Sequence, residues 1–254
     1  MTDPCGYDPD WWKAPKAASV ARKHRAAIPC ATANPGDAFL IVTEGQVTEP
    51  VYFNFLLANL KLRAVRVKVM PGRASDPRHV IETAATEVKD HQAKFKKGLL
   101  TITEPARFEH VWAVIDTDVA VRMGYWNDVK QLAAARKVEL AHSTPCFEYW
   151  LLLHLQYTTR GNLVDGDAAK SAVKQELGRN YSTNEETARE VMPLFMPHWQ
   201  RAVLHAQRVR KLHTDAATPE PANPSTEVDR LVQALNDSAP DYTRNNIREA
   251  LHTQ

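Results

Sequence analysis

The stretch from Phe39 to Tyr52, FLIVTEGQVTEPVY, decides the fold. Its apolar run ends at Thr43 and is followed at once by Glu44, a glycine and, after three more residues, a second glutamate, Glu49. This pattern is typical of a buried β-strand, a turn and the first turn of a helix. The carboxylate of Glu44 therefore stands where a strand ends, and Gly45 permits a sharp exit that brings the backbone close to a ligand.

Strand and helix signals alternate from this stretch to about residue 160. Apolar or β-rich runs, which predict strands, lie at 38–43, 64–70, 110–118 and 138–143. Helix-like segments follow them at 49–61, 76–98, 125–136 and 146–157. Strands that alternate with helices of this length indicate a mostly parallel sheet covered by helices on both faces. The sequence thus predicts an α/β domain over residues 37–160.

The chain on either side of this domain has a different pattern. Residues 1–36 contain several prolines and a basic run, which predicts an extended or partly helical N-terminal arm. Residues 161–254 lack the strand signal and keep helix-like segments, which predicts an α-helical C-terminal subdomain. Pro193 and Pro197 should break or kink the longest of these segments.

Composition narrows the class of protein. Of the 254 residues, 44% are hydrophobic and 24% are charged, and the net charge is +2, all ordinary for a globular protein. The three cysteines are widely spaced and support neither a disulfide framework nor a zinc cluster, which favours a reducing cytoplasm. No apolar run approaches the roughly 18 residues that a membrane-spanning helix needs. A phosphate-binding loop ending in GK[ST] is also absent from the sequence, so we expect no ATP hydrolysis by this chain.

Two aspartates strengthen the case for a site at the sheet edge. Asp116 and Asp118, in VIDTD, would point to the same side of the backbone if the strand continues to Asp118. Ligands of open parallel sheets gather at the carboxyl ends of the strands, where Glu44 is also expected. Three carboxylates placed together would repel one another unless a cation joined them.

The residue types select the cation and the chemistry. Oxygen ligands without nearby His or Cys spacing suit a hard cation, here Mg²⁺ or Mn²⁺. Such an ion would polarise a phosphodiester and orient a water molecule, with Glu44 as general acid or base. The predicted metal neighbours are Glu44, Glu49, Asp116 and Asp118.

Two further carboxylates have alternative explanations. Glu148 lies among apolar neighbours in PCFEYWLLLH, where a lone carboxylate is costly. It either completes the site as a further catalytic residue, or lies on a solvated helix face or beside a buried arginine. Glu49 precedes Pro50, so it either supplies favourable charge at a helix N-terminus or contacts the metal directly or through water.

Basic residues form the candidate nucleic-acid surface. Basic runs at 13–27 and 198–213 either face a phosphate backbone or form a solvated arm and helix face. Arg73 and Arg78 follow the second strand, where they either clamp phosphate or are ordinary surface arginines. The candidates within the two runs are Arg22, Lys23, Arg25, Arg208, Arg210 and Lys211.

Three segments together resemble a known family. FLIVTEGQVTEPVYF at 39–53, VWAVIDTD at 111–118 and AHSTPCFEYWLLLHL at 141–155 are similar to the RloB family of bacterial proteins, whose core resembles the Toprim domain of topoisomerases, primases and OLD-type nucleases. Glu44 matches the Toprim glutamate after the first strand, and Asp116 and Asp118 match its Asp-any-Asp motif. The sequence VAVRMG after the Asp pair departs from the family pattern and leaves a third ligand open.

The resemblance implies a Mg²⁺-dependent nuclease in defence against phage or foreign DNA, beside an ATPase of the ABC or AAA type. We therefore expect an endonuclease acting on DNA or structured RNA such as tRNA, built on a Toprim-like sheet. One alternative is a noncatalytic sensing or binding subunit of a partner ATPase. Another is a metal-dependent phosphatase or nucleotidyl transferase using the same carboxylates. The oligomeric state, including a homo-oligomer, is left open.

Overall fold

Five strands form a sheet in the order β2-β1-β3-β4-β5 in the computed structural model, which describes residues 37–60, 66–72, 76–101 and 104–239. Strands β1 to β4 are parallel, and the short β5 pairs antiparallel with β4. The strands are β1 (Ala38–Thr43), β2 (Arg66–Pro71), β3 (His110–Asp116), β4 (Glu139–Thr144) and β5 (Ser225–Thr226). The predicted α/β fold with a mostly parallel sheet is confirmed.

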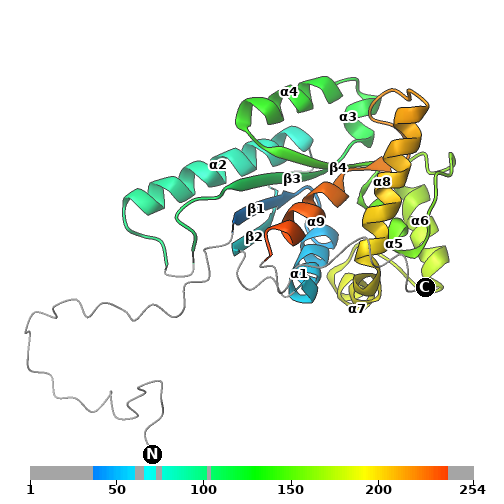
Figure 1. The fold of residues 1–254 in the computed structure, drawn as a ribbon, viewed down its shortest axis with the longest axis horizontal. Coiled ribbons are helices and arrows are strands. Elements are labelled where there is room, and N and C mark those ends of the chain that lie inside the picture. The colour runs from blue at the N-terminus through cyan, green and yellow to red at the C-terminus, as the bar shows by residue number, and fades with distance from the viewer. Residues whose placement is uncertain (1–36, 61–65, 73–75, 102–103, 240–254) are drawn as a thin grey trace, which may run out of the picture. The chain divides into compact units, whose positions relative to one another are not determined.

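Helices cover both faces of the sheet (Figure 1). Helices α2 and α4 pack on one face, and α1, α5 and the C-terminal helices lie on the other. The helices are α1 (Thr48–Leu60), α2 (Pro77–Lys96), α3 (Asp118–Arg122), α4 (Trp126–Arg136), α5 (Phe147–Leu155), α6 (Gly166–Leu177), α7 (Glu185–Phe195), α8 (Trp199–Asp215) and α9 (Val228–Asp237), with a 3-10 turn η2 (Met196–His198) between α7 and α8. The predicted helical C-terminal part is thus present.

The strand order creates a crevice at one edge of the sheet. Strand β1 lies between β2 and β3, so the chain passes from β1 to β2 on one side and then crosses to β3 on the other. The connecting helices α1 and α2 lie on opposite faces of the sheet. In open α/β sheets this reversal opens a space outside the carboxyl ends of the two central strands, here β1 and β3.

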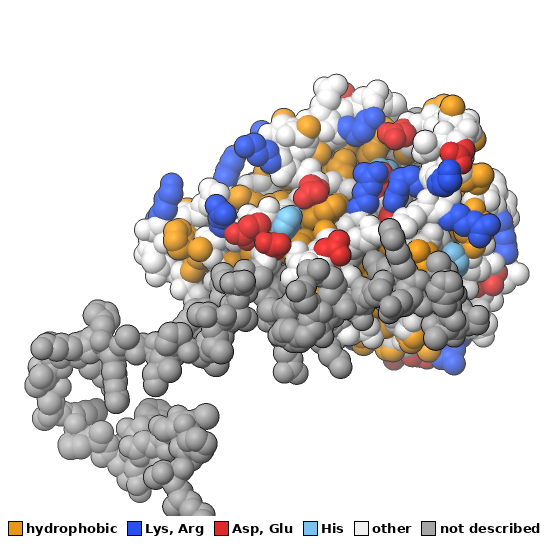
Figure 2. Space-filling view, in the orientation of Figure 1, with side chains coloured by type: hydrophobic (Ala, Val, Ile, Leu, Met, Phe, Trp, Pro, Cys, Tyr) orange, Lys and Arg blue, Asp and Glu red, His pale blue; other side chains and the backbone are white. Residues whose placement is uncertain are grey.

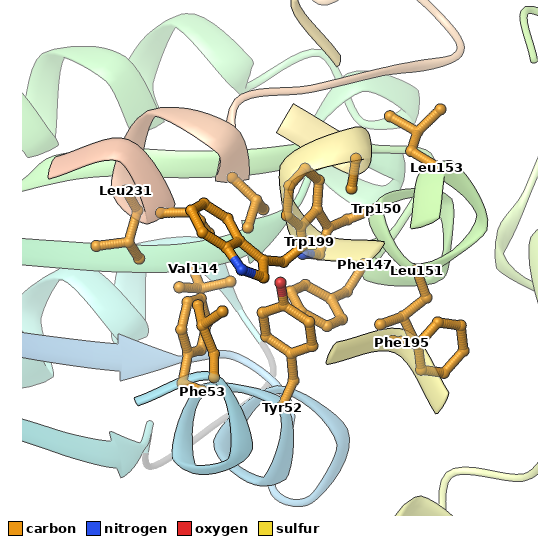
Figure 3. Packing of buried hydrophobic residues seen from close by; sticks show 14 of the residues in the cluster. Tyr52, Phe53, Val114, Phe147, Trp150, Leu151, Leu153, Phe195, Trp199 and Leu231 are labelled. Atoms are coloured by element: carbon orange, nitrogen blue, oxygen red, sulfur yellow. The ribbon is translucent and has the colours of Figure 1, made fainter. Parts of the chain in front are cut away.

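One buried cluster joins the sheet to the C-terminal helices. Tyr52 of α1 packs with Phe147 and Trp150 of α5, and the same cluster includes Phe195 and Leu231 from α7 and α9 (Figure 3). Residues on both sides of position 160 therefore share a core, and all described residues belong to one compact unit. Large apolar side chains buried together in this way are the main source of stability for such a fold.

Two local expectations need revision. Strand β3 ends at Asp116 instead of Asp118, because Thr117 adopts helical backbone angles (φ −102°, ψ −14°) and its carbonyl accepts a hydrogen bond from the Val121 N–H at 2.9 Å. Helix α3 therefore begins at Asp118, and the Thr117 hydroxyl pairs with that of Thr144 at 2.7 Å. The predicted break of the long C-terminal segment occurs at Pro197, within η2, whereas Pro193 lies inside α7.

Some predicted features fall outside the described residues. They are the N-terminal arm, residues 1–36, with its candidates Arg22, Lys23 and Arg25, and also Arg73. Within the described ranges, no helix is long and apolar enough to cross a membrane.

Candidate acidic site

A cavity of about 380 Å³ lies at the carboxyl ends of the parallel strands. The turn after β1 contributes Gly45 to Glu49, and the chain after β3 contributes Asp116 and Asp118. The remaining lining comes from the segment after β4 and from the C-terminal helical part, as Cys146, Phe147, Glu148, Gly166, Lys170 and Thr183. We call this space the acidic cavity. Carboxylates at the ends of β1 and β3 and in the first turn of α5 thus lie in or beside it.

Glu44 is fixed between β1 and β3. Its N–H donates to the Val114 carbonyl at 2.9 Å, and its Oε2 accepts a hydrogen bond from the Asp116 N–H at 3.1 Å. Burial, assisted by the charges of Glu49 and Asp118 and opposed by the hydrogen bond from the Asp116 N–H, raises the pKa of Glu44 to about 8. A carboxyl group with this pKa can give or take a proton near neutral pH.

Glu49 lies in the first turn of α1 and folds back onto the preceding turn. Its Oε1 accepts a hydrogen bond from the Gly45 N–H at 2.9 Å. A Cβ atom on residue 45 would lie 2.0 Å from Glu49 Oε2, so any larger residue there would displace this carboxylate. Burial and the charge of Glu148 raise the pKa of Glu49 to about 7, and the charge of Lys170 partly offsets the rise. The position suits both roles foreseen for Glu49, at a helix N-terminus and beside a metal.

The two aspartates lie at the end of β3 and the start of α3. Asp116 Oδ1 accepts a hydrogen bond from the Phe147 N–H, at the start of α5, at 2.9 Å. Burial raises the pKa of Asp116 well above its usual value, and the charges of Glu49 and Glu44 add to this. Asp118 Oδ1 accepts a hydrogen bond from the Val119 N–H at 2.6 Å. Although the strand does not continue to Asp118, both aspartates line the acidic cavity.

Glu148 is a buried member of the same group. Its side chain is 5% exposed, which excludes the solvated helix face that was one of its alternatives. The Tyr181 hydroxyl donates a 3.2 Å hydrogen bond to Glu148 Oε1. The charge of Glu148 raises the pKa of both Asp116 and Glu49, so the carboxylates are close enough to influence one another.

Several residues of the acidic cavity carry no distinguishing signal in the sequence. Lys170, which is half-buried on α6, lies in an ordinary amphipathic segment more than a hundred residues from Glu49. Tyr181 and Thr183 come from the connection between α6 and α7. These residues join the site only because α5 packs against α6 and carries the C-terminal part over the sheet edge.

Arg78 is the described candidate after the second strand. Its guanidinium makes two hydrogen bonds to the Asp76 carboxylate, at 3.1 Å and 2.7 Å, and lies 4.3 Å from the centre of the Tyr125 ring. The charge of Asp76 contributes to the raised pKa of Glu44, so this pair lies beside the acidic site. With 47% of its side chain exposed, Arg78 remains accessible to a ligand.

The other described basic candidates lie on α8. In Figure 2, basic side chains gather over the region where Figure 1 draws this helix. Arg210 forms a double hydrogen bond with the buried carboxylate of Asp229, at 3.0 Å and 2.6 Å, whereas Lys211 pairs with Asp215 on the surface. Arg208 lies 4.3 Å from the centre of the Tyr157 ring. Because the guanidinium group of Arg210 is paired with Asp229, its positive charge is already neutralised within the protein.

The donor atoms of the acidic cavity suit a hard divalent cation. Burial raises the pKa of the Cys146 thiol, which keeps the sulfur protonated and leaves carboxylate oxygens as the charged ligands. Within the described part of the chain, however, no three His, Cys, Asp or Glu side chains are already arranged to hold a metal ion. Glu44, Glu49 and Asp116 instead accept hydrogen bonds from backbone N–H groups. The ligand types fit such an ion.

Fold and site together define an α/β protein with clustered carboxylates at the switch point of a parallel sheet. The model of the RloB family, described as RloB-like protein, matches residues 39–235, which is most of the chain. The chain belongs to the RloB-like family, as its three sequence segments predicted. No curated protein and no solved structure matches it.

Proposed function

We propose that this protein is a metal-dependent endonuclease that cleaves phosphodiester bonds in DNA or structured RNA. The observation that carries the proposal is the convergence of Glu44, Glu49, Asp116, Asp118 and Glu148 on one cavity edge. Burying several carboxylates together is unfavourable unless protons or a cation neutralise them. A site that retains this arrangement is suited to binding a cation.

Each carboxylate has a role that follows from its position. Asp116 and Asp118 would hold Mg²⁺ or Mn²⁺, with Glu49 and Glu44 as neighbouring ligands. The ion supplies polarisation of the phosphodiester and stabilisation of the leaving oxygen. Glu44, with a pKa near 8, is the candidate general acid or base. Glu148, held by Tyr181, supports the group electrostatically.

A Toprim-type core and a role in antiphage defence are parts of the same proposal. The Toprim-type core is supported by the positions of Glu44 and the Asp pair, at the carboxyl ends of two adjacent parallel strands as in the Toprim pattern. The role in defence is expected from the family resemblance alone. A partner ATPase of the ABC or AAA type is also expected from the family resemblance. Arg78 and Arg208, both with aromatic neighbours, are the described basic residues best suited to contact a nucleic-acid backbone.

A noncatalytic sensing subunit is the second candidate. It is favoured by the backbone hydrogen bonds that already occupy Glu44, Glu49 and Asp116, since these also stabilise the carboxylates without a metal. In that case the carboxylates would be structural and the helical part would dock on an ATPase.

Calorimetric titration of Mn²⁺ and Mg²⁺ separates the two candidates. We expect the wild type to bind, the double variant Asp116→Asn, Asp118→Asn to lose binding, and the exposed control Asp128→Asn to retain it. Cleavage of DNA and tRNA should then be assayed with and without the partner ATPase. Loss of cleavage in Asp116→Asn would support the nuclease, whereas a wild type that binds no metal would favour the sensing subunit. Turnover of small phosphoesters alone would indicate a phosphatase.

A further inference from the structure

The acidic cavity contains one positive side chain. Among the described residues that line it, Lys170 of α6 is the only lysine or arginine. Its charge partly offsets the raised pKa of Glu49, which places the ammonium group within electrostatic reach of the carboxylates. Within the described structure, Lys170 has no hydrogen bond or salt bridge to a protein group. Its charge is therefore available to a ligand.

The hydroxyl of Thr48 is a second polar group in the acidic cavity without a hydrogen-bond partner among the described residues. Thr48, at the start of α1, is 5% exposed and lines the acidic cavity. Its hydroxyl lies near that of Tyr181 but makes no hydrogen bond of good geometry within the described part of the protein. A buried hydroxyl without a partner costs free energy, so a polar ligand in the cavity would be stabilised by it.

We propose that Lys170 and Thr48 bind a phosphate group of the substrate inside the acidic cavity. The inference rests on the proposed function, because carboxylates without a cation would repel an anion. It adds the class of ligand and the residues that recognise it. An ammonium group pairs with phosphate oxygens as a point charge, and a threonine hydroxyl can donate to a further oxygen.

This assignment explains why Lys170 is not simply a counter-ion. A lysine that served to neutralise the carboxylates would be expected to contact one of them directly, as Lys211 contacts Asp215 at 2.9 Å. Lys170 lines the same space without such a contact. Phosphate between the metal and Lys170 would have positive charge on two sides, which is the usual arrangement for binding a phosphoryl group.

The test measures binding of thymidine 5′-monophosphate by calorimetry in the presence of saturating Mn²⁺. The variants are Lys170→Gln, Lys170→Arg and Thr48→Val, with Lys174→Gln on the exposed side of α6 as the matched control. We expect Lys170→Gln to weaken nucleotide binding about 10- to 100-fold and Thr48→Val about 2- to 10-fold, as for loss of a charged and a neutral hydrogen bond. Lys170→Arg should recover most of the affinity.

The Mn²⁺ titration of each variant separates the outcomes. If Lys170 binds phosphate, removing its charge should leave Mn²⁺ affinity unchanged or increase it. Equal nucleotide affinity in Lys170→Gln and Lys174→Gln, with Mn²⁺ bound normally, would overturn this inference alone. Failure of the Mn²⁺-loaded wild type to bind the nucleotide would overturn it as well. If the wild type binds no Mn²⁺, the proposed function fails, and the phosphate site fails with it.

Discussion

The backbone N–H of Asp116 donates a 3.1 Å hydrogen bond to the carboxylate of Glu44, 72 residues earlier in the chain. This bond joins the ends of β1 and β3, the two strands at the switch point of the sheet. The bond holds the Glu44 carboxylate next to the backbone of Asp116, two residues before Asp118. The acidic site is therefore part of the sheet edge and does not depend on a flexible loop for its position.

Replacing Glu44 by Gln should stabilise the metal-free protein in a pH-dependent way. The pKa of Glu44 is raised to about 8 in the folded state, while in the unfolded chain the same carboxyl group has its ordinary pKa of 4.5. Between these values the unfolded state binds fewer protons than the folded state, so the stability of the wild type falls as pH rises. The Gln side chain keeps the acceptor for Asp116. We expect a gain of about 1 to 3 kcal/mol at about pH 8.5 and little change near pH 4.

Urea unfolding in the presence of a chelator measures this gain. The exposed Glu186→Gln on α7 is the matched control and should unfold like the wild type at both pH values. A gain of the same size at low and high pH would contradict the explanation from proton binding.

Metal affinity should rise with pH. Glu49, with a pKa of about 7, and Glu44, with a pKa of about 8, must lose their protons before they can act as charged ligands. For each proton displaced, the apparent affinity should increase about tenfold per pH unit up to about pH 8. Titrations in two buffers that differ in ionisation enthalpy would count the protons released. A constant affinity between about pH 6 and about pH 8 would show that these carboxyl groups do not bind the ion.

Gly45→Ala should disturb the site through Glu49. The added methyl group would lie 2.0 Å from Glu49 Oε2, so the carboxylate must move and lose its hydrogen bond to the residue 45 N–H. We expect a loss of stability of about 1 to 3 kcal/mol and weaker metal binding. The double variant Gly45→Ala, Glu49→Ala should cost less than the sum of the single changes, because the shorter side chain leaves room for the methyl group.

The control for this cycle is Gly161→Ala, since a Cβ there meets no atom within 4 Å and the glycine has no positive φ. If the losses of stability in Gly45→Ala and Glu49→Ala were additive, the added methyl group would not be clashing with the Glu49 carboxylate.

The strand and helix pattern of the sequence was sufficient to predict the sheet edge. Strand β1 occupies residues 38–43 as expected, because an apolar run bounded by a polar turn has few alternatives. The convergence of Glu44 with the Asp pair also follows from the rule that parallel strands present their carboxyl ends together. The sequence did not show that β3 stops at Asp116, since that depends on the helical backbone angles of Thr117, whose carbonyl accepts the first hydrogen bond of α3.

The far wall of the acidic cavity could not be predicted. Lys170 lines the cavity and Tyr181 donates a hydrogen bond to Glu148 because of the packing of α5 on α6, and the local sequence of an amphipathic helix does not identify its neighbours. For the same reason Arg210 was predicted on a basic surface although its partner is Asp229, nineteen residues further along. The pairing depends on how α8 packs against α9, which periodicity leaves undetermined.

Arg210→Ala should therefore act mainly on stability. Asp229 is fully buried, and its two carboxylate oxygens accept hydrogen bonds from the guanidinium group of Arg210. The substitution therefore leaves the negative charge of Asp229 buried without its partner. We expect a loss of about 3 to 5 kcal/mol in the free energy of unfolding, against less than about 1 kcal/mol for Arg189→Ala, whose partner Glu185 is exposed.

Arg208→Ala should leave the free energy of unfolding nearly unchanged and weaken binding to DNA or tRNA. The remaining binding should depend less steeply on salt concentration than that of the wild type. Urea unfolding and binding at two salt concentrations measure both effects. If Arg210→Ala unfolded like the wild type while Arg208→Ala had no effect on binding, the roles assigned to the two arginines of α8 would both be wrong.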